Sequence, residues 1–593
     1  MFQTFDTATN PAQGPERLAA LRAWMGTVGV DGFLVPRADK FQGEYVAHCD
    51  DRLAWLTGFT GSAGFACVLQ GTAGVFIDGR YRIQVRAQVA DCFTPVHWPE
   101  TGLMDWLAET AHPPLTIGFD PWLHTQADID GFQSHPKNQG RITFKPVENG
   151  IDTIWHDRPA PPMGAAFAHP SQYAGETAHS KIARIAQAVA DQGHDACLLT
   201  LPDSVNWLLN IRGSDIARTP IVQAFALVTA AGHVTVISDP AKFQGLDPDP
   251  LVKVVGWDDI TPTLAAINGP VGYDPKQAPV AAVQALTNGV AMDDPTALPK
   301  ACKNAVEVEG ARQAHLRDGA AFCEFLAWFN AQPHAEMTEI DVVTALEGFR
   351  TQTGALHDIS FETISGSGPN GAIVHYRVTD DSNRKLDHNS LLLIDSGGQY
   401  RDGTTDITRT LPLGTPTDDM RQCFTRVLQG MIAISKLRFP RGYAGRDIDA
   451  LARAPLWGDG LDYDHGTGHG VGSFLSVHEG PARISRTSHV PLADGMILSN
   501  EPGYYREGAF GIRIENLIVV TPAPALDGGD TRDHLCFETL TMVPIDTRLI
   551  DHNLLTASER AWLNAYHAQV RDCIAPRLSP GAQAWLNAAT VAI

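Results

Sequence analysis

The sequence predicts an α/β (α+β) fold in which two repeated N-terminal α/β domains precede a third, C-terminal domain. Three observations indicate this organisation. The chain has 593 residues, more than a single hydrophobic core supports. One order of helix and strand patterns occurs twice, at a period of roughly 150 residues, which is a usual domain size. After the second occurrence the pattern changes, and acidic residues follow the apolar strand patterns.

The first block begins with a helical pattern over residues 15–28, followed by the apolar strand of residues 32–35. A Trp-Leu segment with a Gly-Ser turn follows at residues 55–62, and two strand patterns then end near Asp78. The Pro-rich segment 158–162 is typical of a domain joint. The first domain is therefore predicted to end there.

The second block repeats this order. A helical pattern over residues 180–191 leads to the strand 196–199 and to a second Trp-Leu segment with a Gly-Ser turn at 207–214. Two further strand patterns, 224–229 and 233–238, complete it. The shared order predicts an internal duplication of one α/β unit.

The third block begins near Lys303 with a long amphipathic helical pattern over residues 307–329. It contains every acidic cluster discussed below. We therefore predict three domains, spanning residues 1–158, 159–302 and 303–593.

Composition excludes several classes of protein. A formal net charge of −22 argues against a nucleic-acid-binding protein, which needs a basic face. The nine cysteines show no CxxC pairs, so we expect reduced thiols rather than a disulfide framework or a zinc finger. The N-terminal segment lacks an apolar signal region, and no stretch of 18 apolar residues occurs. A cytoplasmic protein is expected.

Four acids stand at strand ends in the third block. Asp395 follows an apolar run and Asp406 lies eleven residues later, with Gly-rich turn sequence between them. Glu501 and Glu515 have the same arrangement, fourteen residues apart. Two hairpins are expected to place each pair at facing positions. Four carboxylates packed together repel one another, so the pattern predicts bound divalent metal, with more than one ion.

His469 lies between these hairpins in the sequence, within the Gly-rich segment 465–472. The glycines are expected to permit close backbone approach to a ligand and positive φ angles. A phosphate-binding loop is excluded, because no Lys-Ser/Thr pair follows. Carboxylates with one imidazole suit Mn, Co, Fe or Zn, and the excess of oxygen ligands favours Mn. Two such ions would ionise a water held between them and polarise a carbonyl group.

Three more histidines, His375, His465 and His478, lie in Gly-flanked or loop segments near the predicted site. A lone histidine is more often a hydrogen-bonded structural group than a catalyst. Because two of them are near the predicted metal loop, a second interpretation stands equally beside the first, in which they orient a substrate carbonyl and move protons to a leaving nitrogen.

These residues resemble those of the pita-bread metallopeptidases, the family of methionine aminopeptidase, prolidase and aminopeptidase P. The resemblance covers essentially the whole chain and is greatest to the long, three-domain cytosolic aminopeptidase P (X-prolyl aminopeptidase) group. It implies two duplicated creatinase-like N-terminal α/β domains followed by a catalytic pita-bread metallopeptidase domain with a C-terminal extension. The matching segments are residues 363–365, 372–376, 393–397, 400–406, 465–472, 478–481, 501–505, 511–516 and 562–567.

The resemblance also implies the metal ligands. Asp395 would bind one divalent ion, while His469 and Glu501 would favour a second. Asp406 and Glu515 would bridge the two ions, which are expected to be Mn²⁺. No ligand position departs from the family pattern.

The remaining site residues are implied in the same way. Glu501 would be the general base, and His375, His465 and His478 would act in catalysis and bind substrate. Arg513, two residues before Glu515, would support the ligand carboxylates and contribute to the substrate site. The implied reaction removes the N-terminal residue from peptides with proline in second position, through a metal-bridging hydroxide that attacks the X-Pro carbonyl. The protein is expected to be a homodimer acting on peptides, with no nucleic-acid or membrane partner.

Three alternatives remain in view. A prolidase would share the ligands but cleave only X-Pro dipeptides. A creatinase would work without metal, and the acidic ligand set argues against it. A non-catalytic relative would have lost ligands, and none is lost here. In the N-terminal blocks Arg80 and Arg212 are candidates for shaping an entrance or a dimer contact, although structural turn arginines are the simpler interpretation.

Overall fold

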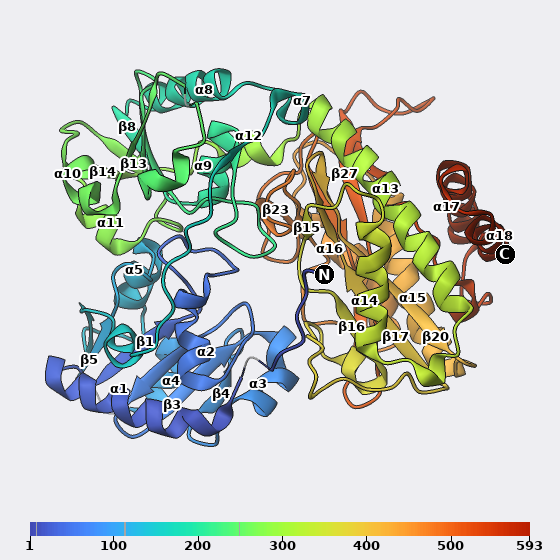
Figure 1. The fold of residues 1–593 in the computed structure, drawn as a ribbon, viewed down its shortest axis with the longest axis horizontal. Coiled ribbons are helices and arrows are strands. Elements are labelled where there is room, and N and C mark those ends of the chain that lie inside the picture. The colour runs from blue at the N-terminus through green and yellow to red at the C-terminus, as the bar shows by residue number, and fades with distance from the viewer. Residues whose placement is uncertain (8, 112–113, 248) are drawn as a thin grey trace. The chain divides into compact units, whose positions relative to one another are not determined.

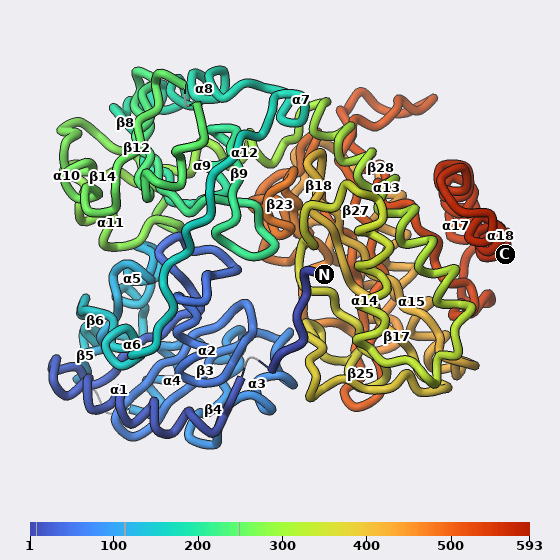
Figure 2. The backbone as a smooth tube through the Cα atoms, viewed as in Figure 1, coloured from blue at the N-terminus to red at the C-terminus, as the bar shows by residue number. Residues whose placement is uncertain are grey.

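The computed structural model describes all residues except 8, 112–113 and 248. The chain forms two compact units. The N-terminal unit comprises Ala8–Ser171 and Glu176–Ala297, and the C-terminal unit comprises Met1–Thr7, Gln172–Gly175 and Leu298–Ile593. The first residues of the chain therefore belong to the C-terminal unit, as the blue start of the tube in Figure 2 shows.

The first domain of the N-terminal unit is a six-stranded sheet in the order β4-β3-β2-β1-β5-β6 (Figure 1). The strands are β1 (Gly32–Pro36), β2 (Phe65–Leu69), β3 (Ala73–Ile77), β4 (Thr94–His97), β5 (Leu115–Phe119) and β6 (Ile142–Pro146). The helices are α1 (Gly14–Val28), α2 (Arg52–Thr57), α3 (Arg82–Gln88), α4 (Leu103–Thr110), α5 (Gln126–Ser134) and α6 (Gly150–Ile154). Helix α1 matches the predicted helix and ends at Gly29, which adopts the left-handed conformation that favours glycine.

The second domain repeats this sheet in the order β12-β11-β10-β8-β13-β14. Its strands are β8 (Ala196–Leu199), β10 (Phe225–Thr229), β11 (Val234–Ile237), β12 (Val252–Val255), β13 (Val271–Tyr273) and β14 (Gly289–Ala291), and β7 (Phe167–Ala168) pairs with β9 (Ile211–Arg212). Its helices are α8 (Ala178–Asp191), α9 (Pro202–Leu209), α10 (Ile260–Ala265) and α11 (Val280–Gln284). Corresponding strand pairs have the same parallel or antiparallel direction in both sheets. The predicted duplication is confirmed.

The two repeats also exchange backbone hydrogen bonds reciprocally. The first two residues of α5 donate amide hydrogens to the loop after β13, and the first two residues of α11 donate to the loop after β5. The bonds are Gln126 N to Ala278 O (3.1 Å), Ala127 N to Pro275 O (2.8 Å), Val280 N to His124 O (3.0 Å) and Ala281 N to Pro121 O (2.9 Å). Each bond of the first pair has its counterpart in the second at the equivalent position of the repeat, so the contact has local twofold symmetry.

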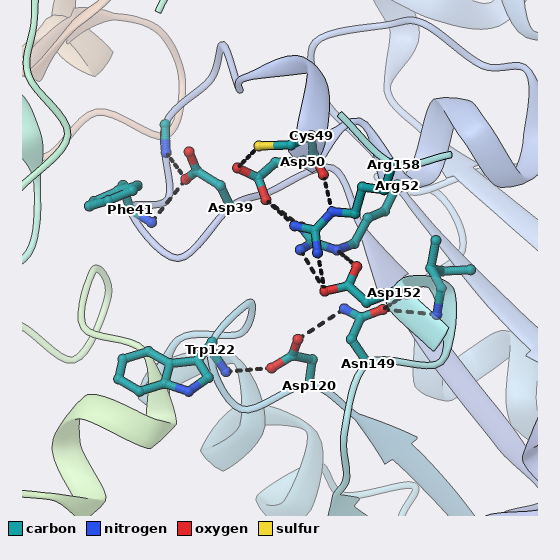
Figure 3. Close-up of polar contacts among 12 residues, drawn as sticks. Asp39, Phe41, Cys49, Asp50, Arg52, Asp120, Trp122, Asn149, Asp152 and Arg158 are labelled. Carbon is teal, nitrogen blue, oxygen red and sulfur yellow. Dashed lines mark hydrogen bonds and ion pairs between the residues drawn. The ribbon is translucent and has the colours of Figure 1, made fainter. Parts of the chain in front are cut away.

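The first domain contains a network of ion pairs (Figure 3). Arg52 is buried and donates two hydrogen bonds to Asp152 and one to Asp50. Arg158 also pairs with both carboxylates. Beside this network Asp120 accepts a hydrogen bond from Asn149 at 2.9 Å. The two arginines and two aspartates of this network are therefore paired with one another.

Arg80 and Arg212, the two arginines considered for an entrance or a dimer contact, are both bonded within their own domains. Arg80 forms a two-pronged pair with Asp78. Arg212 is 2% exposed and donates to the backbone carbonyls of Asn206 and Ile211. These contacts support the structural interpretation.

The C-terminal unit combines a three-stranded sheet, β16-β17-β20, with a six-stranded sheet, β21-β28-β27-β24-β22-β23. The strands are β15 (Asp358–Ile359), β16 (Ile364–Ser367), β17 (Ser390–Ser396), β18 (Gly398–Tyr400), β19 (Gly403–Thr404), β20 (Ile407–Leu413), β21 (Arg438–Pro440), β22 (Gly468–Gly470), β23 (Glu479–Ile484), β24 (Ile497–Asn500), β25 (Gly503–Arg506), β26 (Phe510–Arg513), β27 (Asn516–Pro522) and β28 (His534–Thr539). The helices are α7 (Ser171–Ala174) at the unit boundary, α12 (Ala297–Ala301), α13 (Ala305–Asn330), α14 (Glu339–Thr351), α15 (Asp418–Ser435), α16 (Gly445–Trp457), α17 (Ala557–Ile574) and α18 (Pro580–Ala589).

Helix α13 is the long helix that the sequence predicts. Asn304 begins it with a capping box. The Asn304 side chain accepts hydrogen bonds from backbone N–H groups, and the Glu307 carboxylate accepts one from the backbone N–H of Asn304. Its apolar face, including Phe322 and Phe325, packs in a large core with Leu392 of β17 and residues of α15 and α17. This core holds the three-stranded sheet in place.

All nine cysteines are free, in agreement with the expectation of reduced thiols. None of the helices in the described part of the chain has the length and apolar character that a membrane crossing requires.

Asp39 is expected to make the stability of the N-terminal unit depend on pH. It is 1% exposed, and burial, with the nearby charge of Asp50, raises its pKa to about 7. An acid whose pKa is higher in the folded state binds its proton more tightly there, so folding stability falls as pH rises from about 4 through about 7, by on the order of 4 kcal/mol. Asp39→Asn removes this dependence, because asparagine stays neutral.

Thermal unfolding of both proteins from about pH 5 to about pH 8 tests this, since that range spans the folded pKa. The melting temperature of wild type should fall relative to that of Asp39→Asn as the pH rises. Parallel curves would contradict the assignment.

Candidate metal centre

Asp395 and Asp406 come from the antiparallel pair β17 and β20. Asp395 lies in β17 and pairs with Thr408 of β20. Asp406 lies in the segment between β19 and β20, two residues before Thr408. The expectation that the two acids occupy facing positions is therefore wrong for this hairpin, because the register is offset by two residues. Both residues are nevertheless buried, at 8% and 4% exposure.

Glu501 and Glu515 flank the pair formed by β24 and β27. Asn500, the last residue of β24, pairs with Asn516, the first residue of β27. Glu501 and Glu515 are the next residues outward, where the ladder has ended, and the N–H of Glu501 donates instead to the carbonyl of Thr467 at 2.8 Å. That these two acids face each other stays a prediction. The hairpin of β25 and β26 fills the chain between them.

The two acid pairs meet because the two sheets are bonded to each other at Glu515. The backbone N–H of Glu515 donates to the carbonyl of Thr408 at 3.1 Å, and the Thr408 hydroxyl donates to Glu515 Oε2 at 2.8 Å. Thr408 also pairs with Asp395. One threonine thus connects an acid of each hairpin.

His469 completes the group from β22, the strand next to β24. Its Nε2 lies 3.3 Å from a carboxylate oxygen of Glu501 and 3.5 Å from one of Asp406. Ligand atoms of Asp406, His469 and Glu515 all lie within 4.8 Å of one another.

The glycines of this segment serve strand packing. A Cβ on Gly468 would lie 1.9 Å from the carbonyl oxygen of Ser499, and one on Gly470 would lie 2.3 Å from that of Glu479. Neither glycine has positive φ, contrary to the expectation for this segment. Close approach of neighbouring strands, rather than an unusual conformation, requires glycine here.

The electrostatics of the group fit bound cations. Burial raises the pKa of Asp406 well above its usual range, and the charges of Asp395 and Glu501 add to the effect. Burial also raises the pKa of Glu515, followed by the charges of the other three acids. One buried carboxylate oxygen of each of Asp395, Asp406 and Glu515 has no hydrogen-bond partner. Such oxygens with one imidazole form a donor set suited to hard divalent metal ions.

Arg513 is hydrogen-bonded to this group. It is 2% exposed, and its guanidinium donates to Asp395, to the Thr408 hydroxyl and to the hydroxyl of Tyr505 at 2.6 Å. The contact with Asp395 is the arrangement expected of a residue that orients a ligand carboxylate.

Tyr505 was not predicted as a site residue. Its hydroxyl bonds to Arg513 and lies 2.9 Å from Nε2 of His465. Burial raises its pKa to about 12, so the phenol is neutral near neutral pH. The sequence did contain a signal: Tyr505 lies two residues after Gly503, on the same face of β25. The missing side chain of Gly503 leaves room for the Tyr505 hydroxyl, which lies 2.6 Å from the position of a Cβ there.

The three additional histidines lie next to this group in different ways. The ring of His478 is 4.3 Å from the ring of His469, nearly perpendicular to it. His465 is connected through Tyr505. His375 follows Val374, whose carbonyl oxygen is 3.5 Å from Nη1 of Arg513. All three are half-buried.

Models of known families match nearly the whole chain. Residues 309–522 match metallopeptidase family M24, and residues 533–593 match the C-terminal region of that peptidase family. Residues 17–154 and 157–307 each match a creatinase/prolidase N-terminal domain. A relative called aminopeptidase P2 from Arabidopsis thaliana is 38% identical, with 96% of this chain and 87% of that protein covered. The chain belongs to the M24 metallopeptidases.

Further relatives agree with this assignment. A probable Xaa-Pro aminopeptidase P of Laccaria bicolor is 39% identical, over 96% of this chain and 92% of that protein. The crystal structure of X-prolyl aminopeptidase from Caenorhabditis elegans, described as a cytosolic enzyme with a di-nuclear active site, superposes with a TM-score of 0.92. It is 30% identical and covers 98% of this chain and 100% of that one. The predicted resemblance to aminopeptidase P and the predicted fold, creatinase-like domains before a pita-bread domain, are confirmed.

Metal binding should stabilise this M24 domain measurably. When Mn²⁺ is added to protein treated with a chelator, the melting temperature is expected to rise. At a thousandfold excess over Kd, the free energy of unfolding should increase by up to roughly 4 kcal/mol. Glu515→Gln should remove most of that gain, because it removes one unpartnered oxygen and one charge.

Glu339→Gln is the matched control. Glu339 is equally buried, but its carboxylate accepts hydrogen bonds from Ser367, Asn370 and Tyr376. This variant should lower the melting temperature yet keep the Mn²⁺ response. An undiminished response in Glu515→Gln would show that the ion binds elsewhere.

Proposed function

We propose that this protein is a metal-dependent aminopeptidase that removes the N-terminal residue from peptides with proline in the second position. One observation carries the proposal: the ligand atoms of Asp406, Glu515 and His469 lie within 4.8 Å of one another, and both of these buried acids have an unpartnered carboxylate oxygen. The names of the relatives support the choice of substrate.

Two divalent ions would be held by the five predicted ligands. Asp395 would bind one ion and His469 with Glu501 the other, while Asp406 and Glu515 would bridge. The excess of carboxylate oxygens favours Mn²⁺. When bound, the ions supply Lewis acidity toward the scissile carbonyl and lower the pKa of water.

Glu501 is suited to be the general base. It is half-buried, and its Oε1 accepts a hydrogen bond from the Ser499 hydroxyl at 3.0 Å, which fixes the carboxylate beside His469. From this position it would take a proton from the attacking water. When the C–N bond breaks, the proline nitrogen leaves as an amine and must receive a proton, and the one taken from water would supply it.

The half-buried histidines would hold the substrate. His478 and His375 would contact the scissile carbonyl and the leaving nitrogen, with His465 beside them. Arg513 and Tyr505 would hold Asp395 and His465 in fixed orientations. The carboxylates also provide an anionic receiver for the free α-amine of a peptide.

A prolidase is the nearest alternative, because it shares the ligand set. Xaa-Pro dipeptidase from Bacillus anthracis covers 62% of this chain with a TM-score of 0.50 and 23% identity, which shows a common fold alone. The long relatives named as aminopeptidases favour cleavage of longer peptides. A homodimer and a cytosolic location remain predictions from the resemblance.

Substrate length and sequence provide the direct test. Purified protein with Mn²⁺ should release arginine from Arg-Pro-Pro, because the second residue is proline and the chain continues beyond it. Chelation should abolish release, and Arg-Ala-Pro should resist cleavage. Chromatography with mass detection measures all three, and activity confined to the dipeptide Arg-Pro would instead identify a prolidase.

Asp406→Asn tests whether the carboxylate cluster is the catalytic centre. The variant loses one negative charge and one bridging oxygen, so kcat should fall by roughly a thousandfold, the equivalent of several kcal/mol of transition-state stabilisation. Elemental analysis should show less metal per chain. Turnover equal to wild type would exclude the dinuclear centre.

A further inference from the structure

Three charged side chains form a buried cluster beside the predicted ligands. Glu479, Lys300 and Lys303 have side chains only 1–2% exposed. Lys300 Nζ lies 3.1 Å from Glu479 Oε1, while Lys303 Nζ donates to Oε2 and, at 2.6 Å, to the carbonyl of Lys300. Burying charges is unfavourable, and apolar residues of similar volume would often stabilise a fold equally well. Stability alone therefore does not explain the cluster.

Glu479 is directly connected to the candidate metal centre. It is the first residue of β23 and pairs with Gly470, the residue after His469. The preceding residue, His478, has its ring 4.3 Å from the ring of His469. His478 lies in the bend that immediately precedes this strand. An anchored Glu479 carboxylate therefore fixes the backbone from which His478 extends.

The lysines are themselves fixed to the strand that leads to Glu501. The N–H of Lys303 donates to the carbonyl of Gly495 at 3.0 Å, and Cys302 forms a β-bridge with Met496. Strand β24 begins at the next residue and ends just before Glu501. The cluster thus connects the backbone around His478 with the backbone that positions the proposed general base.

The carboxylate keeps its charge in this setting. Burial by itself would raise the pKa of Glu479, but the charges of Lys300 and Lys303 outweigh burial and hold that pKa below its usual value. The cluster is consequently a true ion pair with two cations, which resists rotation better than a neutral hydrogen bond.

We propose that Glu479, held between Lys300 and Lys303, is a positioning residue that keeps His478 against His469 for the reaction. This inference rests on the proposed function, in which His478 contacts the substrate. Glu479 acts through its neighbour and touches neither substrate nor metal.

A double-mutant cycle separates positioning from general stability. Glu479→Gln should lower kcat on Arg-Pro-Pro by roughly 10- to 100-fold, the usual effect of removing a group that orients an active-site residue. KM and metal content per chain should change little. In a His478→Ala background the same substitution should cost nothing further, because the residue it positions is gone. Losses that multiply, or an unchanged kcat in the single variant, would overturn the proposal.

Substitutions of Lys303 test the same cluster in case Glu479→Gln does not fold. Lys303→Met leaves Glu479 paired with Lys300, and should lower kcat several-fold, while Lys303→Arg should restore most of it. Asp215→Asn is the matched control, because it breaks a buried pair of the same kind, 2.7 Å from Lys242 in the N-terminal unit. It should lower the melting temperature without changing kcat.

The outcome for wild type separates the two levels of inference. Wild-type protein that fails to cleave Arg-Pro-Pro contradicts the proposed function itself. If wild type is active, two results together would contradict only the role of Glu479. The Lys303→Met variant would be folded and fully active, and the losses in the double-mutant cycle would multiply.

Discussion

The crowding of buried carboxylates is the constraint on which the catalytic M24 domain depends. Asp406 and Glu515 lie in the interior with unpartnered oxygens, where like charges repel and solvation is lost. Cations relieve this cost, and Arg513 provides one of them from the protein itself. Metal ions would bind the remaining unpartnered oxygens. The repulsion between the carboxylates would then be relieved on binding, which increases the affinity of the site for metal.

Such a site requires rigid surroundings, and Arg409 provides much of this rigidity. It is 1% exposed and donates hydrogen bonds to the carbonyl of Glu515 and to Asn516 at the start of β27. The same guanidinium reaches the carbonyl of Val543 and the hydroxyl of Tyr566 in α17. The C-terminal extension is thereby bonded to the strand that begins after a proposed ligand, which makes it part of the support for the site.

The duplicated N-terminal domains satisfy their charges differently. In the first of them, Arg52 and Arg158 both form ion pairs with the carboxylates of Asp50 and Asp152. Among the described residues, the one group arranged like metal ligands lies in the C-terminal unit. The two repeats are thus connected by reciprocal backbone contacts, and the candidate ligands belong to the M24 domain.

The sequence alone determined the duplication and indicated four candidate acids with His469, because apolar periodicity, acids at strand ends and glycine-rich segments are local patterns. Tertiary structure decided the rest. The two-residue offset between Asp395 and Asp406 depends on the pairing of β17 with β20, and Thr408 meets Glu515 across 107 residues. Lys303 meets Glu479 across 176 residues. No local pattern encodes which distant strand will lie alongside, since packing of the whole core sets that choice.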